Sequence, residues 1–107
     1  IVPPITPYFV MKVGHVPLIP YHRPGDPAVG DLVAAAIAER RRRGGRLHAV
    51  MLDRLGPNAW GATPAAAMAV LEELEETAKL WLLGDRRIAP LDEAAIAELR
   101  QTFDAPW

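Results

Sequence analysis

Proline is concentrated at the start of this chain, and no other feature constrains its fold as strongly. The sequence has 107 residues and 11 prolines. Seven prolines fall in the first 27 residues: Pro3, Pro4, Pro7, Pro17, Pro20, Pro24 and Pro27. Proline lacks a backbone N–H donor and breaks helix interiors, so we predict no helix in this quarter of the chain. Residues 8–13 and 15–21, rich in β-branched and aromatic types, are predicted to be extended and joined near Gly14. Pro17 and Pro20 place the second segment at a sheet edge or leave it unpaired.

The middle of the chain favours a helix followed by a pair of strands. Asp26 and Pro27 are typical of a helix start, and the helix is predicted to end at Gly44. The apolar run 47–52 predicts a buried strand between turn signals. Residues 54–61 predict a turn that returns as a brief second strand.

Two more helices are predicted in the second half. Thr63 caps a long helix whose first position is Pro64, and Gly84 ends it. A last helix begins after Asp92, with Leu91 and Ile96 at the spacing of a hydrophobic staple, which is an apolar contact across the helix start. The order of elements indicates a mixed α/β class.

Composition excludes several classes of function. The chain has 12 Lys and Arg against 13 Asp and Glu, so no overall charge attracts nucleic acid or anionic lipid. It has no cysteine, which excludes disulfides and cysteine zinc sites, and no serine, which excludes a serine nucleophile. No run approaches the ~20 apolar residues of a membrane span, and we expect a cytoplasmic protein. The chain opens on Ile1 without a signal-peptide pattern, so we expect part of a longer protein, with trimming of a disordered start as the alternative.

The polar clusters favour structural roles. No two of His15, His22 and His48 share a spacing typical of metal ligands. His48 is predicted to be a partnered structural residue, and the other two histidines are predicted to be exposed. The arginine run 40–43 fits the last turn of a helix, where cations stabilise the negative end of the dipole. Trp107 is interpreted as a packing residue, or as one that covers a neighbouring subunit.

Several segments, in their order and spacing, resemble a known family. They are Thr6 to Tyr8, Val16 to Tyr21, Arg23 to Asp26, Gly56 to Gly61 and Leu71 to Leu80. These segments are similar to the C-terminal half of the class II aldolase/adducin family. The subgroup of 3-oxo-tetronate 4-phosphate decarboxylases also has an ending that resembles residues 83–86 and 97–100.

The resemblance implies a fold and an activity. It implies a three-layer αβα fold with a mostly antiparallel sheet, of which residues 1–107 form the C-terminal portion of a single domain. Family members are typically homotetramers with active sites between subunits. A divalent metal, usually zinc, is held by three histidines and polarises the carbonyl oxygen of the substrate while a carbon–carbon bond breaks.

Two functional interpretations follow from the resemblance. The first is a lyase that decarboxylates or cleaves a phosphorylated sugar acid such as 3-oxo-tetronate 4-phosphate. The second is a catalytically degenerate, adducin-like member that acts as an oligomerising structural or binding module. Both imply a homo-oligomer, without a nucleic-acid or membrane partner.

One catalytic position is implied in this chain. Family members use a tyrosine from a neighbouring subunit as a proton donor to the departing group, and Tyr8 in Thr6-Pro7-Tyr8 matches it. The alternative interpretation of Tyr8 is a half-buried strand residue.

The family's metal site is incomplete in this sequence. The paired His-x-His ligands and the acid/base Glu belong to the N-terminal half of the family. The third histidine lies in an Asn-His-Gly motif, which falls on residues 54–56, so Leu55 occupies the ligand position. Asp53 or Asn58 is the alternative source of an oxygen ligand. We therefore expect that this chain alone binds no metal and is inactive.

Overall fold

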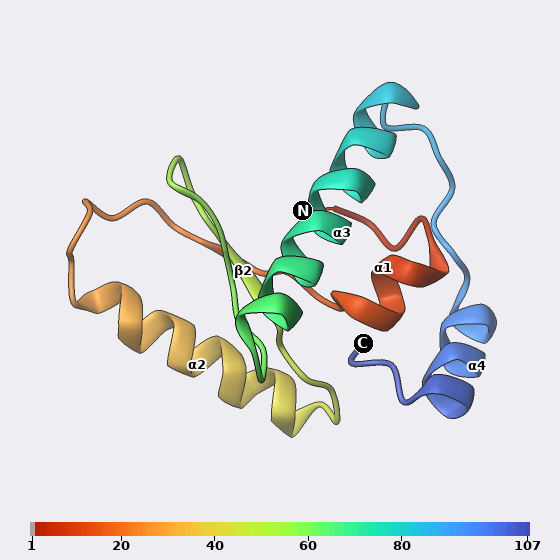
Figure 1. Ribbon diagram of the computed structural model, residues 1–107, viewed down its shortest axis with the longest axis horizontal. Coiled ribbons are helices and arrows are strands. Elements are labelled where there is room, and N and C mark those ends of the chain that lie inside the picture. Colours follow the sequence, from red (N-terminus) through yellow and green to blue (C-terminus); the bar gives the residue numbers. More distant parts are fainter. Residues whose placement is uncertain (1) are drawn as a thin grey trace.

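The computed structural model describes residues 2–107, which form four helices and three short strands (Figure 1). In chain order the elements are α1 (Pro7–Lys12), β1 (Leu18–Ile19), α2 (Ala28–Arg42), β2 (Ala49–Leu52), β3 (Gly56–Ala59), α3 (Pro64–Leu83) and α4 (Glu93–Phe103). The predicted α/β class is confirmed, and so are the helices and strands predicted after residue 26.

The three strands form one sheet in the order β1-β2-β3. β1 pairs with β2 in parallel, with Leu18 opposite Met51. β2 pairs with β3 antiparallel, with Val50 opposite Asn58. Within the described residues β1 lies at an edge of this sheet, as its prolines predicted. The sheet in residues 2–107 is mixed, with one parallel and one antiparallel pair, so the mostly antiparallel character is not seen in this part of the chain.

The prediction that the proline-rich start contains no helix was wrong. Residues Pro7–Lys12 within it form helix α1. Pro7 stands at the first helical position, where a missing N–H leaves no bond unmade. The Thr6 side-chain oxygen caps the helix by accepting the Phe9 N–H at 3.1 Å. Phe9 and Val10 are fully buried, so tertiary packing stabilises this short helix.

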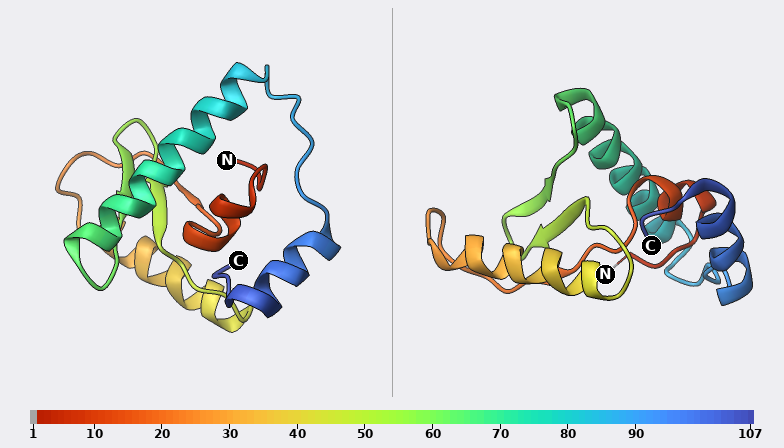
Figure 2. Two further views of the ribbon diagram at one scale, coloured as in Figure 1. Left: turned by 45° about the vertical axis from the view of Figure 1, so that its right-hand side comes forward. Right: turned by 90° about the horizontal axis from the view of Figure 1, so that it is seen from below.

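Strand β2 is packed on both faces. Ala49 belongs to an apolar cluster with Phe9 of α1 and Leu74 of α3. Its neighbour Val50 belongs to a second cluster, which partly buried residues of α2 complete. Successive strand side chains point to opposite faces, and Figure 2 shows α2 and α3 on opposite sides of the β2–β3 hairpin. A complete three-layer domain is still a prediction.

The two C-terminal helices begin at the predicted caps. The Thr63 side-chain oxygen accepts the Ala66 N–H at 3.1 Å, and Gly84 is the C-cap of α3. The Asp92 carboxylate accepts the Ala95 N–H at 2.8 Å. Between residues 2 and 107, none of the helices is long and apolar enough to cross a membrane.

Candidate active site

Tyr8 lies on the exposed side of α1. Its side chain is 59% exposed, whereas the next two residues, Phe9 and Val10, are fully buried. These buried neighbours fix the helix to the core and leave the phenol at the surface. The interpretation of Tyr8 as a half-buried strand residue is therefore wrong.

Lys12 lies one helical turn after Tyr8. Its ammonium nitrogen is 5.8 Å from the centre of the Tyr8 ring, within the range of a cation–π contact. A positive charge thus stands beside the Tyr8 ring. The sequence analysis did not single out Lys12, although the i,i+4 spacing from Tyr8 on a helix could have indicated it.

Leu55 lies in the tight turn that joins β2 to β3. Its backbone N–H donates to the Leu52 carbonyl oxygen at 3.0 Å. The flanking residues Arg54 and Gly56 both have positive φ, 64° and 112°, so a glycine at position 56 suits this turn. The Leu55 side chain is 46% exposed at the tip of the hairpin.

The side chains around this turn do not fit a divalent metal. Leu55 has no lone pair, and the carboxylate of Asp53 alone does not make a ligand set. His48 precedes β2, at the opposite end of the strand from Leu55. Throughout residues 2–107, no three or more His, Asp or Glu side chains are grouped so as to hold a metal ion.

The structure does not bring Tyr8 and Leu55 together. Figure 1 shows the tip of the β2–β3 hairpin pointing away from α1, and both views of Figure 2 show the same separation. Within one copy of the chain, Tyr8 and Leu55 therefore belong to different regions.

His15 is less exposed than predicted. Its ring stacks on Trp107, with ring centres 3.9 Å apart, and Trp107 also meets Phe9 edge-on at 6.3 Å. Burial, together with the nearby charges of Arg40 and Arg43, lowers the pKa of His15 to about 4. Trp107 is thus a packing residue in this structure. No spacing in the sequence indicates this contact, because it joins opposite ends of the chain.

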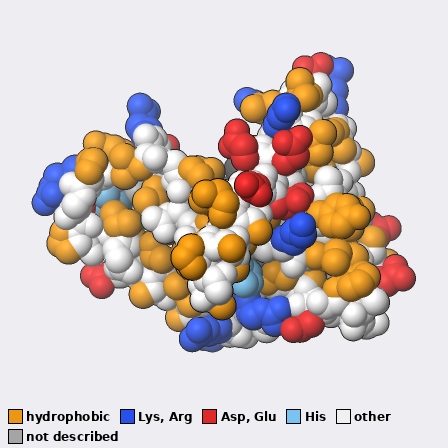
Figure 3. Space-filling model, viewed as in Figure 1, with side chains coloured by type: hydrophobic (Ala, Val, Ile, Leu, Met, Phe, Trp, Pro, Cys, Tyr) orange, Lys and Arg blue, Asp and Glu red, His pale blue; other side chains and the backbone are white. Residues whose placement is uncertain are grey.

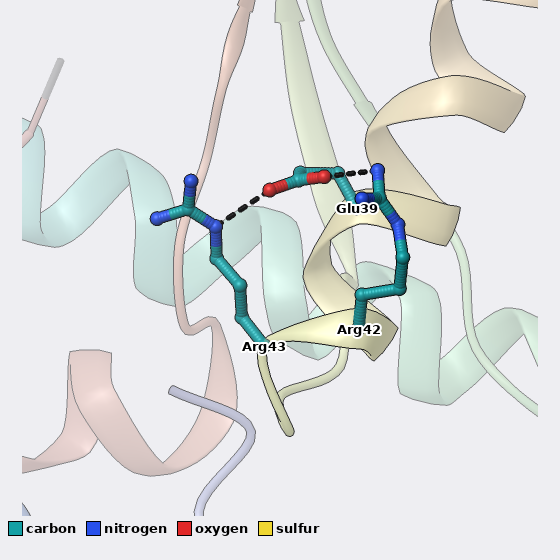
Figure 4. Close-up of polar contacts among 3 residues, drawn as sticks. All are labelled: Glu39, Arg42 and Arg43. Atoms are coloured by element: carbon teal, nitrogen blue, oxygen red, sulfur yellow. Dashed lines mark hydrogen bonds and ion pairs between the residues drawn. The ribbon is translucent and has the colours of Figure 1, made fainter.

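The arginines at the end of α2 differ in their partners. The Glu39 carboxylate accepts a hydrogen bond from Arg43 at 2.6 Å and also pairs with Arg42 (Figure 4). The hydrogen bond from Arg43, followed by the charge of Arg42, lowers the pKa of Glu39. Arg40 has no ion-pair partner among residues 2–107. In Figure 3, blue side chains gather along the lower edge of the molecule, where α2 ends in Figure 1.

Comparison with known proteins gives consistent results. Residues 1–82 match the family described as "Class II Aldolase and Adducin N-terminal domain". A 3-oxo-tetronate 4-phosphate decarboxylase of Cupriavidus necator is 51% identical over the whole chain, which covers 48% of that protein. The protein of the same name from Escherichia coli K12 is 44% identical over 94% of the chain, which covers 44% of it.

Two solved structures are also similar to this chain. The crystal structure of YgbL from Escherichia coli matches 94% of this chain and 45% of its own, with a TM-score of 0.74 and 44% identity. YgbL from Klebsiella pneumoniae matches with a TM-score of 0.70 and 43% identity over 92% of this chain and 45% of its own. The chain thus spans about half the length of the curated relatives it matches.

Proposed function

Because the chain belongs to the class II aldolase and adducin family, we propose that the whole protein is a lyase that breaks a carbon–carbon bond in a phosphorylated sugar acid. The proposed substrate is 3-oxo-tetronate 4-phosphate, and the proposed reaction is its decarboxylation. The observation that carries this proposal is the similarity, along the full chain, to relatives named for that reaction. The chain is proposed to form the C-terminal portion of the catalytic domain.

The substrate's own structure makes this reaction feasible. Its ketone lies β to the carboxylate, so carbon dioxide can leave while the electron pair of the broken bond moves toward the ketone oxygen. The resulting enediolate then takes a proton at the carbon that lost carbon dioxide. An enzyme accelerates such a step with a positioned proton donor, typically by about 10²–10⁴-fold.

We assign the donor role to Tyr8. Its hydroxyl belongs to an exposed side chain on a helix that buried neighbours hold in place, so a substrate can reach it. The Lys12 ammonium beside the ring favours an anionic substrate at the same surface. Since Tyr8 lies away from the β2–β3 turn, we propose that each chain supplies Tyr8 to the site of a neighbouring copy in a homotetramer.

A second candidate function is a non-catalytic module, and Leu55 favours it. A leucine at the family's third ligand position removes a metal-binding group while the turn itself is retained. Such a protein would keep the fold and the oligomer surface, as in the adducin branch.

Two measurements on the whole protein separate these candidates. The first is release of carbon dioxide from 3-oxo-tetronate 4-phosphate, and the second is zinc, cobalt and manganese content by elemental analysis. Carbon dioxide release supports the lyase, and stoichiometric metal in the same sample would show that other side chains complete the site. A protein that assembles but releases no carbon dioxide supports the second candidate and contradicts the first.

A further inference from the structure

A cavity of about 330 Å³ lies between the C-terminal half of α2 and the segment that leads into β1. Its exposed lining is mainly apolar, and charged side chains and one histidine also contribute to it. The apolar lining residues are Val16, Pro17, Ala36 and Leu47, and the polar ones are His15, Glu39, Arg40 and Arg43. Neither Tyr8 nor Leu55 belongs to this lining, so the cavity is separate from the positions described above.

Arg40 is the unusual side chain in this wall. Its Nε atom is buried and has no hydrogen-bond partner among residues 2–107. Native structures leave few buried donors unsatisfied, and a charged donor is the most unfavourable to leave without an acceptor. Burial, followed by the charge of Arg100, lowers the pKa of Arg40, yet a guanidinium stays protonated in proteins.

Gly45 allows Arg40 to take this position. A Cβ atom on Gly45 would collide with the Arg40 guanidinium and would lie 2.8 Å from the Pro106 carbonyl oxygen. The guanidinium therefore lies against bare backbone, and the packing holds it in place. The enclosed Nε atom cannot itself reach a ligand, but its packing fixes the side chain. Arg40 also lines the cavity, where its terminal N–H groups can meet an acceptor that a ligand brings.

The charges around the cavity favour an anion. Glu39 is the one acidic side chain in the lining, and Arg42 and Arg43 already hold its carboxylate. Arg46 is paired with Asp104 at 3.0 Å, and in the described part of the chain Arg40 has no carboxylate partner. The low pKa of His15 leaves its ring neutral at pH 7, so the ring can donate one N–H without adding charge.

We propose that this cavity binds an oxyanion, a phosphate monoester or a carboxylate, through the Arg40 guanidinium. His15, held by its stack on Trp107, provides a second donor. The apolar lining accepts the carbon part of the ligand. Arginine suits this role because its planar fork matches the paired oxygens of phosphate and carboxylate. The site is independent of the proposed lyase activity.

The test is a titration of the whole protein with inorganic phosphate, replacing potassium chloride at constant ionic strength and constant pH. The readout is the ring Cε1–H resonance of His15 in two-dimensional NMR. We expect a saturable shift of this resonance. Arg40→Gln should weaken binding about tenfold or more, because a charge-assisted hydrogen bond is lost.

Arg41→Gln is the matched control, since it removes the same charge from the same helix but lies outside the cavity lining. Its dissociation constant should stay within about twofold of the wild-type value. Arg40→Lys keeps the charge but loses the planar fork of the guanidinium, so its dissociation constant should lie between those of the wild type and Arg40→Gln. It replaces Arg40→Gln if that variant fails to fold.

A parallel titration with acetate separates the ligand classes. Saturation by phosphate alone supports a phosphate monoester, and saturation by both anions supports a carboxylate as well.

Two results would overturn the proposal. One is a wild-type resonance that fails to saturate with either anion, as expected if only water occupies the cavity. The other is an equal loss of affinity in Arg40→Gln and Arg41→Gln, which would reflect general attraction to the arginine-rich helix end.

Discussion

His15 and His48 both have a lowered pKa, and burial is the main cause for each. Arg40 and Arg43 add to the effect at His15, and Arg46 adds to it at His48. A histidine whose pKa is lower in the folded state than in the unfolded state binds a proton preferentially when unfolded. Each neutral ring therefore makes its full contribution to the free energy of unfolding at pH values above the unfolded-state pKa of about 6.5. This contribution is lost as the pH falls toward the pKa of the ring in the folded state.

The resulting prediction concerns pH and the free energy of unfolding. Between pH 7 and pH 4, the free energy of unfolding measured by urea denaturation should fall, and His15→Gln should make this fall smaller. His22→Gln is the matched control, because within residues 2–107 the side chain of His22 has one hydrogen-bond partner, the nearby Pro20 carbonyl oxygen at 2.7 Å. A pH profile that His15→Gln leaves unchanged would show that this ring is not protonated on unfolding.

At the scale of the elements, the two glycines near the ends of α2 have opposite surroundings. Gly30 lies inside the helix with open space where a Cβ would stand. Gly45 lies just beyond the helix, where a Cβ would meet Arg40 and the Pro106 carbonyl oxygen. Alanine favours helix over glycine, whereas overpacking a buried position is destabilising.

Substitution by alanine should therefore have opposite effects at these two sites. We expect Gly30→Ala to raise the free energy of unfolding by about 0.5 kcal/mol, and Gly45→Ala to lower it by about 1–3 kcal/mol. Urea denaturation of the two variants measures both effects against the same wild-type protein. Wild-type stability in Gly45→Ala would contradict the close packing of Arg40 on this glycine.

Sequence patterns predicted the longer elements because their signals are local. Thr63, Pro64 and Gly84 mark the ends of α3, and the same residues bound it in the structure. The start of the chain was mispredicted because the number of prolines was given more weight than their positions. Pro7 is compatible with a helix at its first position, and burial of Phe9 and Val10 comes from contacts distant in sequence.

The candidate sites also divide into features that the sequence indicates and features that depend on contacts between distant residues. The resemblance selected Tyr8, and the Leu55 substitution was visible in the sequence itself. The exposure of Tyr8 depends on which face of α1 packs inward, so only the structure reveals it. The cavity beside Arg40 combines side chains from three separate segments with Trp107 behind His15, and no local pattern predicts such a grouping.

At the scale of the whole molecule, much apolar surface lies open. Leu82 and Leu83 at the end of α3 are 58% and 73% exposed, and Leu18 in the edge strand β1 is 52% exposed. An edge strand with exposed apolar side chains is suited to pairing or packing with another chain. The rest of the proposed domain and a neighbouring copy are the two candidate partners for this surface, and the proposal of a homo-oligomer requires the second.

Analytical ultracentrifugation at micromolar concentration tests that proposal. For the whole protein, we expect a sedimenting species with a mass several times that of one polypeptide, and the proposed state is a tetramer. The distribution should keep its main species on tenfold dilution if the interface is large and apolar. A single species with the mass of one chain would contradict the proposed assembly.

The rate of carbon dioxide release from 3-oxo-tetronate 4-phosphate tests most directly whether Tyr8 supplies the proton. The comparison is between the wild-type whole protein, Tyr8→Phe and the control Tyr21→Phe, which removes the hydroxyl of the other exposed tyrosine. We predict that Tyr8→Phe lowers kcat by about 10²-fold or more with an unchanged circular dichroism spectrum, while Tyr21→Phe stays within about twofold. No release by the wild-type protein, or an equal kcat in Tyr8→Phe, would contradict the assignment of Tyr8 as the proton donor of a lyase.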